Sequence, residues 1–236
     1  MRLRREQVVA TALRLLNDVG LDALTMRRLG QELNVQAATL YWHIKNKEEL
    51  LDAMAEAMLA GCASGAPEEL SGIERAADMA ERLRKALLAH RDGARVFAGT
   101  YVAQDNTLRV SDTLVGALRD GGLSPRAAAW GCWSIVYYVI GFTLEEQALV
   151  ARPGTDTGKA APERFRETVG RGAYPHLAAV LPHLVSPDHE ARFRYGLQLI
   201  LKGLELDVGI EGTPRAKTSR SSTRAGDKRR ASRGSG

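Results

Sequence analysis

Residues 25–47 combine short polar and basic side chains with a few regularly spaced apolar ones. Four apolar residues have a spacing that fits two short helices crossing at a steep angle, with these side chains facing the core: Leu29, Leu33, Val35 and Leu40. Asn34 falls between these helices, where the turn requires a left-handed backbone conformation that Asn tolerates best after Gly. The pattern predicts a helix-turn-helix whose second helix has a free outer face.

If Leu40 packs beneath the N-terminal helix over residues 5–19, the opposite face of its own helix points outward. That face carries the side chains of Gln36, Ala37, Thr39, Tyr41 and His43. These groups are short or polar, so the helix is narrow enough to reach base edges in the major groove of DNA. Phosphate contacts could come from the positive end of the helix that opens at Asn46 and from four side chains: Arg27, Tyr41, His43 and Lys47. A plain helical hairpin with a charged rim would show the same spacing.

No combination of residues points to an enzyme or to a bound metal. Residues 154–160, GTDTGKA, resemble a phosphate-binding loop, but the loop is one residue short, lacks Ser or Thr after Lys159 and follows a helical pattern. His176, His183 and His189 are spaced too irregularly, with too few acidic neighbours, for a metal site. We find no nucleophile elbow and no paired-carboxylate motif. We therefore expect a binding protein without a cofactor.

The composition favours an all-α fold. In this chain of 236 residues 44% are apolar and only 6% are aromatic, and Ala, Leu, Arg and Gly dominate. Two isolated cysteines, Cys62 and Cys132, indicate reduced thiols and a cytoplasmic protein. Periodicity, N-caps and Ser-Pro pairs predict a helix after Thr25 and further helices over 5–19, 37–43, 46–60, 73–90, 106–120, 125–150, 162–169 and 187–207.

A break at residues 64–67 divides the chain into a helix-turn-helix domain over 1–62 and a larger helical domain over 68–209. Residues 210–236 form a tail with eight Lys/Arg against two acids, while the whole chain has a net charge of +5. The tail lacks hydrophobic periodicity, so we expect it to be disordered. It would either strengthen nonspecific DNA binding or act only as a solubiliser.

Residues 127–144 contain no charged side chain and reach the short limit for a membrane span. Trp130, Ser134, Tyr137 and Tyr138 interrupt the middle of this stretch. We interpret it as a helix covered on all sides by protein, and expect no membrane partner.

The block at residues 39–47, TLYWHIKNK, followed by LLD at 50–52, resembles the signature of the tetracycline-repressor (TetR) family. The similarity is strong over residues 5–60 and continues in three later segments: 90–94, 141–145 and 193–197. The resemblance implies a DNA-binding domain joined to a ligand-binding and dimerisation domain. It also implies operator contacts from Thr25, Arg27, Thr39, Tyr41, His43 and Lys47. Ala37 and Ala38 depart from the base-reading Gln and the Pro of tetracycline-binding members, so Gln36 would read a different operator.

The resemblance also places an effector pocket in the second domain. Tetracycline-binding members coordinate drug-bound magnesium through a His where this chain has Phe97, whose ring offers no lone pair to a metal. Ala63, Met79 and Leu83 also replace the drug contacts of those members, although Thr100 and Glu145 are retained. We expect an apolar effector bound without magnesium, near eight residues: Met79, Leu83, Phe97, Thr100, Leu114, Trp133, Tyr137 and Glu145. A filled core without a ligand is the alternative.

The helices over 125–150 and 187–207 are expected to form a homodimer. Gly196 and Gly203 are seven residues apart on one helix face, which allows close helix approach, and the resemblance implies a four-helix bundle. A two-fold dimer matches a palindromic operator, with recognition helices about 34–36 Å apart. An effector that shifts the helix after Asn46 would release DNA. A regulator without an effector, or an activator, remains an alternative.

Overall fold

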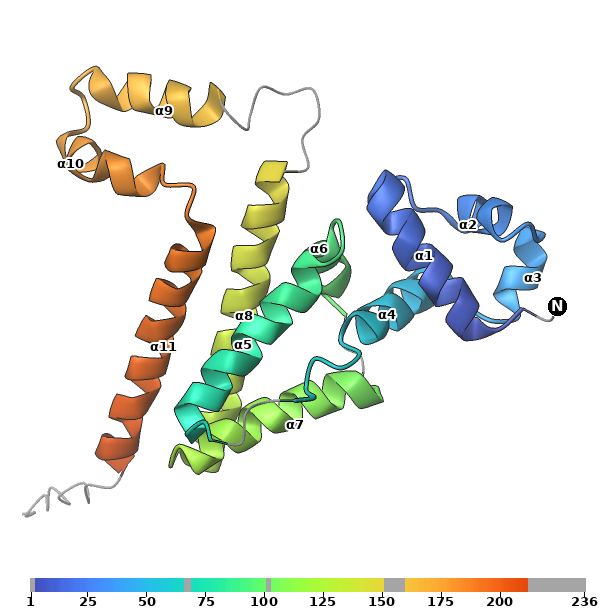
Figure 1. The fold of residues 1–236 in the computed structure, drawn as a ribbon, viewed down its shortest axis with the longest axis horizontal. Coiled ribbons are helices and arrows are strands. Elements are labelled where there is room, and N and C mark those ends of the chain that lie inside the picture. Colours follow the sequence, from blue (N-terminus) through green and yellow to red (C-terminus); the bar gives the residue numbers. More distant parts are fainter. Residues whose placement is uncertain (1–2, 66–68, 101–102, 151–159, 212–236) are drawn as a thin grey trace, which may run out of the picture.

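The computed structural model describes residues 3–65, 69–100, 103–150 and 160–211. The tail predicted for residues 210–236 lies outside this part, apart from its first two residues. The described residues form helices and turns but no strand, which confirms the all-α class (Figure 1). In chain order the helices are α1 (Arg5–Val19), α2 (Met26–Glu32), α3 (Ala37–Tyr41), α4 (Lys47–Met58), α5 (Gly72–Leu88), α6 (Gly93–Phe97), α7 (Asp105–Asp120), α8 (Pro125–Val150), α9 (Ala160–Gly170), α10 (Pro175–Leu184) and α11 (His189–Glu211).

The four N-terminal helices pack around one apolar core and contain the predicted helix-turn-helix. The Thr25 side chain begins α2 by accepting a hydrogen bond from the Arg28 N–H at 3.1 Å. Asn34 has a φ of 52°, which confirms the left-handed turn between α2 and α3. Leu29 and Leu40 are fully buried, so each helix is fixed to the core by its apolar side.

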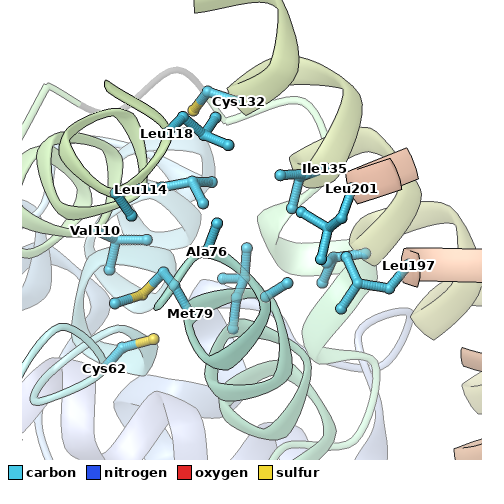
Figure 2. Close-up of a cluster of buried hydrophobic side chains, with 14 of the residues drawn as sticks. Cys62, Ala76, Met79, Val110, Leu114, Leu118, Cys132, Ile135, Leu197 and Leu201 are labelled. Atoms are coloured by element: carbon cyan, nitrogen blue, oxygen red, sulfur yellow. The ribbon is translucent and has the colours of Figure 1, made fainter. Parts of the chain in front are cut away.

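The second core lies among α5, α7, α8 and α11 (Figure 2). Met79 of α5, Leu114 of α7, Ile135 of α8 and Leu197 of α11 are each at most 2% exposed. The helices are amphipathic around this core, and burial of such side chains is the main favourable term in their packing. The contact between α5 and α7 is the most extensive in the fold.

The structure corrects the expected end of one helix and the expected start of another, and it contains one helix that was not predicted. α3 ends at Tyr41 and not at His43, and α11 begins at His189 and not at Pro187. The later start of α11 arises because the Asp188 carboxylate accepts the Ala191 N–H at 2.9 Å and so acts as the N-cap. α10 was not predicted, because Pro182 interrupts its apolar spacing.

α8 is covered only in part within one chain, so full coverage of this helix by protein would require a partner subunit. By length and composition Pro125–Ala148 could cross a membrane, yet only 39% of its most apolar window is buried within the described structure. Its inner face packs on α5, α7 and α11. Its outer face exposes Trp130, Trp133 and Tyr137, each by about half or more.

Candidate DNA interface and ligand cavity

α3 presents polar side chains outward because its apolar residues anchor it from the other side. Leu40 and the following Ile44 are fully buried in the N-terminal core. Gln36 and Thr39 are exposed, Tyr41 is half exposed and His43 is partly buried. Ala37 is the first residue of α3. The predicted recognition residues therefore share one short segment with an accessible outer surface.

An ion pair fixes the end of this segment to the neighbouring helices. The Arg5 guanidinium donates to the His43 carbonyl at 3.1 Å and to the Glu49 carboxylate at 2.6 Å. Glu49 also accepts the Lys45 N–H at 2.8 Å, while Asn46 caps α4 by accepting the Glu49 N–H at 2.7 Å. The Lys45 N–H and then Arg5 lower the pKa of Glu49. The arrangement holds the α3–α4 turn in one geometry.

The remaining predicted DNA contacts surround this surface. Thr25, Arg27 and Lys47 are exposed, and Lys47 opens α4. Sequence reasoning did not select Trp42, which is 89% exposed directly after α3. Its position two residues after the buried Leu40, on the opposite side of a helix, was the signal that could have identified it.

A cavity of about 410 Å³ lies between α5, α6, α7 and α8 and is partly open to solvent. Its volume falls within the roughly 300–1,000 Å³ range of small-molecule sites. Five of the eight predicted effector residues line it: Leu83, Phe97, Thr100, Trp133 and Tyr137. Trp133 and Tyr137 stack with ring centroids 5.3 Å apart, one helical turn from each other on α8.

The other three predicted effector residues lie elsewhere. Met79 and Leu114 are 1% exposed and fill the core between α5 and α7, so they do not line the cavity. Glu145 is exposed and lines a separate groove with Tyr138 and Arg192. These positions depend on how helix faces are rotated against one another, which the sequence pattern did not resolve.

Sequence reasoning also missed one wall of the cavity, which α7 supplies. Thr107, Leu108, Ser111 and Val115 line it from successive turns of that helix. Their spacing of three and four residues was a usable signal. Cys132 of α8 also lines the cavity, and burial raises the pKa of its thiol.

The residues of this cavity do not fit a magnesium complex. None of its described lining residues carries a carboxylate or an imidazole, the groups that hold magnesium or a magnesium-bound drug. Phe97, at which the resemblance implied the loss of a metal ligand, lies on the cavity wall. The lining therefore offers aromatic surface in place of metal ligands.

α6 joins the cavity to the N-terminal helices. Val96 belongs to the N-terminal core, whereas the next residue, Phe97, lines the cavity. Before α6, the Asp92 carboxylate accepts the Leu21 N–H at 2.9 Å, and Arg95 pairs with Asp22 at 2.8 Å. A displacement of α6 would therefore also move Leu21 and Asp22, which directly follow α1.

Glu56 of α4 makes a second connection. Its carboxylate accepts the backbone N–H groups of Asn106 and Thr107 at 2.6 and 3.1 Å, and the Thr107 hydroxyl at 2.8 Å. These groups form the N-terminal end of α7, where a negative charge is favourable. Thr107 also lines the cavity, so Glu56 connects α4 directly to a residue of the cavity wall.

Comparison with known proteins agrees with both halves of this architecture. Residues 8–54 match the family model "Bacterial regulatory proteins, tetR family", and residues 65–208 match "Tetracyclin repressor-like, C-terminal domain". The chain is 39% identical over 207 residues to the tetracycline repressor protein class C of Escherichia coli, covering 86% of this chain and 91% of that relative.

Solved structures show the same similarity. A possible TetR family transcriptional regulator from Streptomyces coelicolor A3(2) is 50% identical, with a TM-score of 0.78 over 86% of this chain and 98% of that one. The Streptomyces coelicolor TetR family protein ActR, in complex with (S)-DNPA, is 31% identical, with a TM-score of 0.76 over 89% and 100% of the two chains. The relatives are transcriptional regulators, not enzymes. The chain therefore belongs to the TetR family of transcriptional repressors, with a DNA-binding helix-turn-helix at its N-terminal end.

Proposed function

We propose that this protein is a cytoplasmic, homodimeric repressor that binds a palindromic DNA operator and is released by an apolar small-molecule effector. The observation that carries the proposal is the outer surface of α3, whose polar side chains are accessible while Leu40 anchors the helix. The Arg5–Glu49 pair fixes the adjoining turn, so little conformational entropy remains to be lost on binding DNA.

Two groups of residues would share the contacts with DNA. Gln36, Ala37 and Thr39 lie at the start of α3, the part of a recognition helix that reaches base edges. The backbone phosphates would be contacted by Thr25, Arg27, Tyr41, His43 and Lys47. Trp42 is exposed beside them and adds aromatic surface to the interface.

The proposed dimer interface is the uncovered apolar face of α8 and α11. On α11, Tyr195, Leu199 and Leu206 are 55–72% exposed, and Trp130 of α8 is 61% exposed. A face of this kind on long helices favours a second copy of the chain, which would complete a helix bundle. Gly196 and Gly203 of α11 differ: Gly196 packs on Tyr138 of the same chain, whereas Gly203 has nothing within 4 Å of an added Cβ. Of these two glycines, Gly203 is thus the one available for close approach by a partner.

An effector in the cavity would reach the DNA-binding helices by two routes. In the first route, Phe97 of the cavity wall belongs to α6, and Asp92 before α6 is hydrogen-bonded to Leu21 after α1. In the second, Thr107 of the cavity wall is hydrogen-bonded to Glu56 of α4. An occupant that displaces either wall would change the separation of the two recognition helices and weaken DNA binding. The retained cavity supports a regulator with an effector over one without.

Selection from a random duplex library tests the DNA-binding proposal. The full chain is expected to enrich a palindrome, with half-sites separated by about one helical turn, as for a two-fold dimer. Sedimentation of the free protein should give twice the mass of one chain. Gln36→Ala should relax the base preference at one position of each half-site, whereas the surface variant Lys85→Ala, on α5, should leave the enriched sequence unchanged. Enrichment of no duplex, or of a single asymmetric half-site, contradicts the proposal.

A further inference from the structure

Three aliphatic hydroxyl groups line the cavity in addition to the phenol of Tyr137, and each of these three has already donated its proton. The Thr100 hydroxyl donates to the Phe97 carbonyl at 2.7 Å, and the Ser111 hydroxyl donates to the Thr107 carbonyl at 3.0 Å. The Thr107 hydroxyl donates to the Glu56 carboxylate at 2.8 Å. Carbonyl and carboxylate oxygens can only accept, so the direction of all three hydrogen bonds is fixed.

A hydroxyl has one proton and two lone pairs, so these groups can offer a ligand only acceptors. Thr107 and Ser111 are four residues apart on α7 and therefore share one side of the cavity. A ligand that also presents acceptors there would leave lone pairs facing each other without a proton between them. A ligand that presents O–H or N–H groups would satisfy them.

The charge near this wall excludes an anion. The Glu56 carboxylate lies directly behind Thr107, and the described lining residues include no cationic side chain to offset it. A ligand carboxylate placed against α7 would lose its hydration and face the acceptor oxygens of Thr107 and Ser111.

A second part of the lining, from α8 and α6, is aromatic. Trp133 and Tyr137 of α8 stack with an interplanar angle of 27°, and Phe97 of α6 adds a third ring to the lining. Aromatic faces of this kind favour an offset-stacked planar partner. Trp133 and Tyr137 also carry N–H and O–H donors, whereas the hydroxyls of Thr107 and Ser111 offer acceptors on the α7 side of the cavity.

We infer that the effector of this cavity is an uncharged, flat aromatic molecule that donates hydrogen bonds from hydroxyl or N–H groups toward α7. The inference rests on the proposed effector function and specifies the chemical class that the site selects. The aromatic wall sets the shape of the ligand, while the hydroxyls of Thr107 and Ser111 set its polarity.

Three probes on one ring system separate these features: a naphthalenediol, its dimethyl ether and the corresponding dicarboxylate. Binding to the full-length protein is measured by titration calorimetry. We expect the diol to bind at least about fivefold more tightly than the ether, because one net hydrogen bond contributes roughly 1 kcal/mol. The dicarboxylate should bind at least about tenfold more weakly than the diol.

Ser111→Ala should lower the preference for diol over ether by about two- to tenfold while leaving ether binding unchanged. Ser134→Ala is the matched control: the Ser134 hydroxyl donates to the Trp130 carbonyl at 2.9 Å, with the same spacing as Ser111, but it does not line the cavity. The control should leave the preference unchanged. Circular dichroism of both variants verifies that they remain folded.

An ether that binds as tightly as the diol, a dicarboxylate that binds most tightly, or a diol that does not bind at millimolar concentration would each overturn the inference. An equal effect of Ser111→Ala on diol and ether would do so as well. These results are separable from failure of the proposed function. An ether that binds and still releases DNA would preserve the effector role of the cavity, whereas a chain that enriches no duplex refutes the DNA-binding role whatever the probes do.

Discussion

Arg84 holds α5, α8 and α11 together, and its replacement gives the sharpest test of the fold that carries the cavity. Its side chain is 6% exposed, and its Nε and Nη2 donate to the Glu146 carboxylate at 3.0 and 2.9 Å. Nη1 donates to Glu190 at 2.6 Å, and the guanidinium lies 4.7 Å from the ring centroid of Phe193. Arg84→Met keeps most of the volume but removes the charge and all three hydrogen bonds.

The two carboxylates contribute differently to the expected loss. Glu146 is only 16% exposed, so leaving it unpaired carries most of the cost of a broken buried ion pair, about 3–5 kcal/mol. The side chain of Glu190 is 44% exposed, so solvent screens its share. We therefore expect Arg84→Met to lower the free energy of unfolding by about 3 kcal/mol, near the lower end of this range.

Urea unfolding followed by circular dichroism measures this loss, at one fixed protein concentration because the proposed dimer makes stability concentration-dependent. Arg109→Met is the control, since the Arg109–Asp105 pair is exposed on both sides and its loss should cost far less than the loss of the Arg84 pairs. Adding Glu146→Leu to Arg84→Met should restore much of the stability, because no buried carboxylate then lacks a partner. Equal losses for the two single variants, or no recovery in the double variant, would refute the electrostatic explanation.

Three further measurements test other parts of the molecule. Lys47→Ala should weaken binding to all duplexes alike and reduce the slope of log affinity against log salt by roughly 0.9 per half-site, with Lys85→Ala as an exposed control that leaves the slope unchanged. Burial raises the pKa of the Cys62 thiol to about 11, so a thiol reagent near pH 8 should label Cys62 about a hundredfold or more slowly in the folded chain than in urea; equal rates would contradict the buried position. The Lys45 N–H and Arg5 lower the pKa of Glu49, so its stabilisation is present above the unfolded-state pKa and is lost as the pH falls through the lower folded-state value. In urea titrations the stability difference between wild type and Glu49→Gln should accordingly shrink in acid, and a difference that stays constant with pH would count against the ion pair.

The local features of the helices could be predicted because they depend on residues only a few positions apart. Gly20 ends α1 and Thr25 caps α2, as expected from their residue types. The Ser124–Pro125 pair begins α8, where the Ser124 hydroxyl accepts the Ala127 N–H at 3.3 Å. The cap of α4 is not a capping box: Asn46 accepts the Glu49 N–H, but the Glu49 carboxylate accepts the N–H of Lys45 and not that of Asn46.

The composition of the cavity could be predicted only in part. The aromatic residues of α8 were found. On α7 the prediction chose Leu114, which fills the core as Met79 does, and it missed the residues of that helix that line the cavity. An amphipathic pattern shows that a helix has an inner face, but it does not show which inner residues meet other side chains and which border a void. That distinction requires the crossing angles of four helices at once.

The sequence by itself determined the helix-turn-helix, its left-handed turn at Asn34 and the outward polar surface of α3. These features follow from backbone preferences and apolar spacing within single turns of helix, where the interacting groups are close in the chain. Only the tertiary structure decided that Glu56 of α4 caps α7 beside the cavity, and that the Thr107 hydroxyl has no proton left to give a ligand. The physical reason is that these hydrogen bonds join groups from separate helices, and their donors and acceptors are assigned only once the helices have packed.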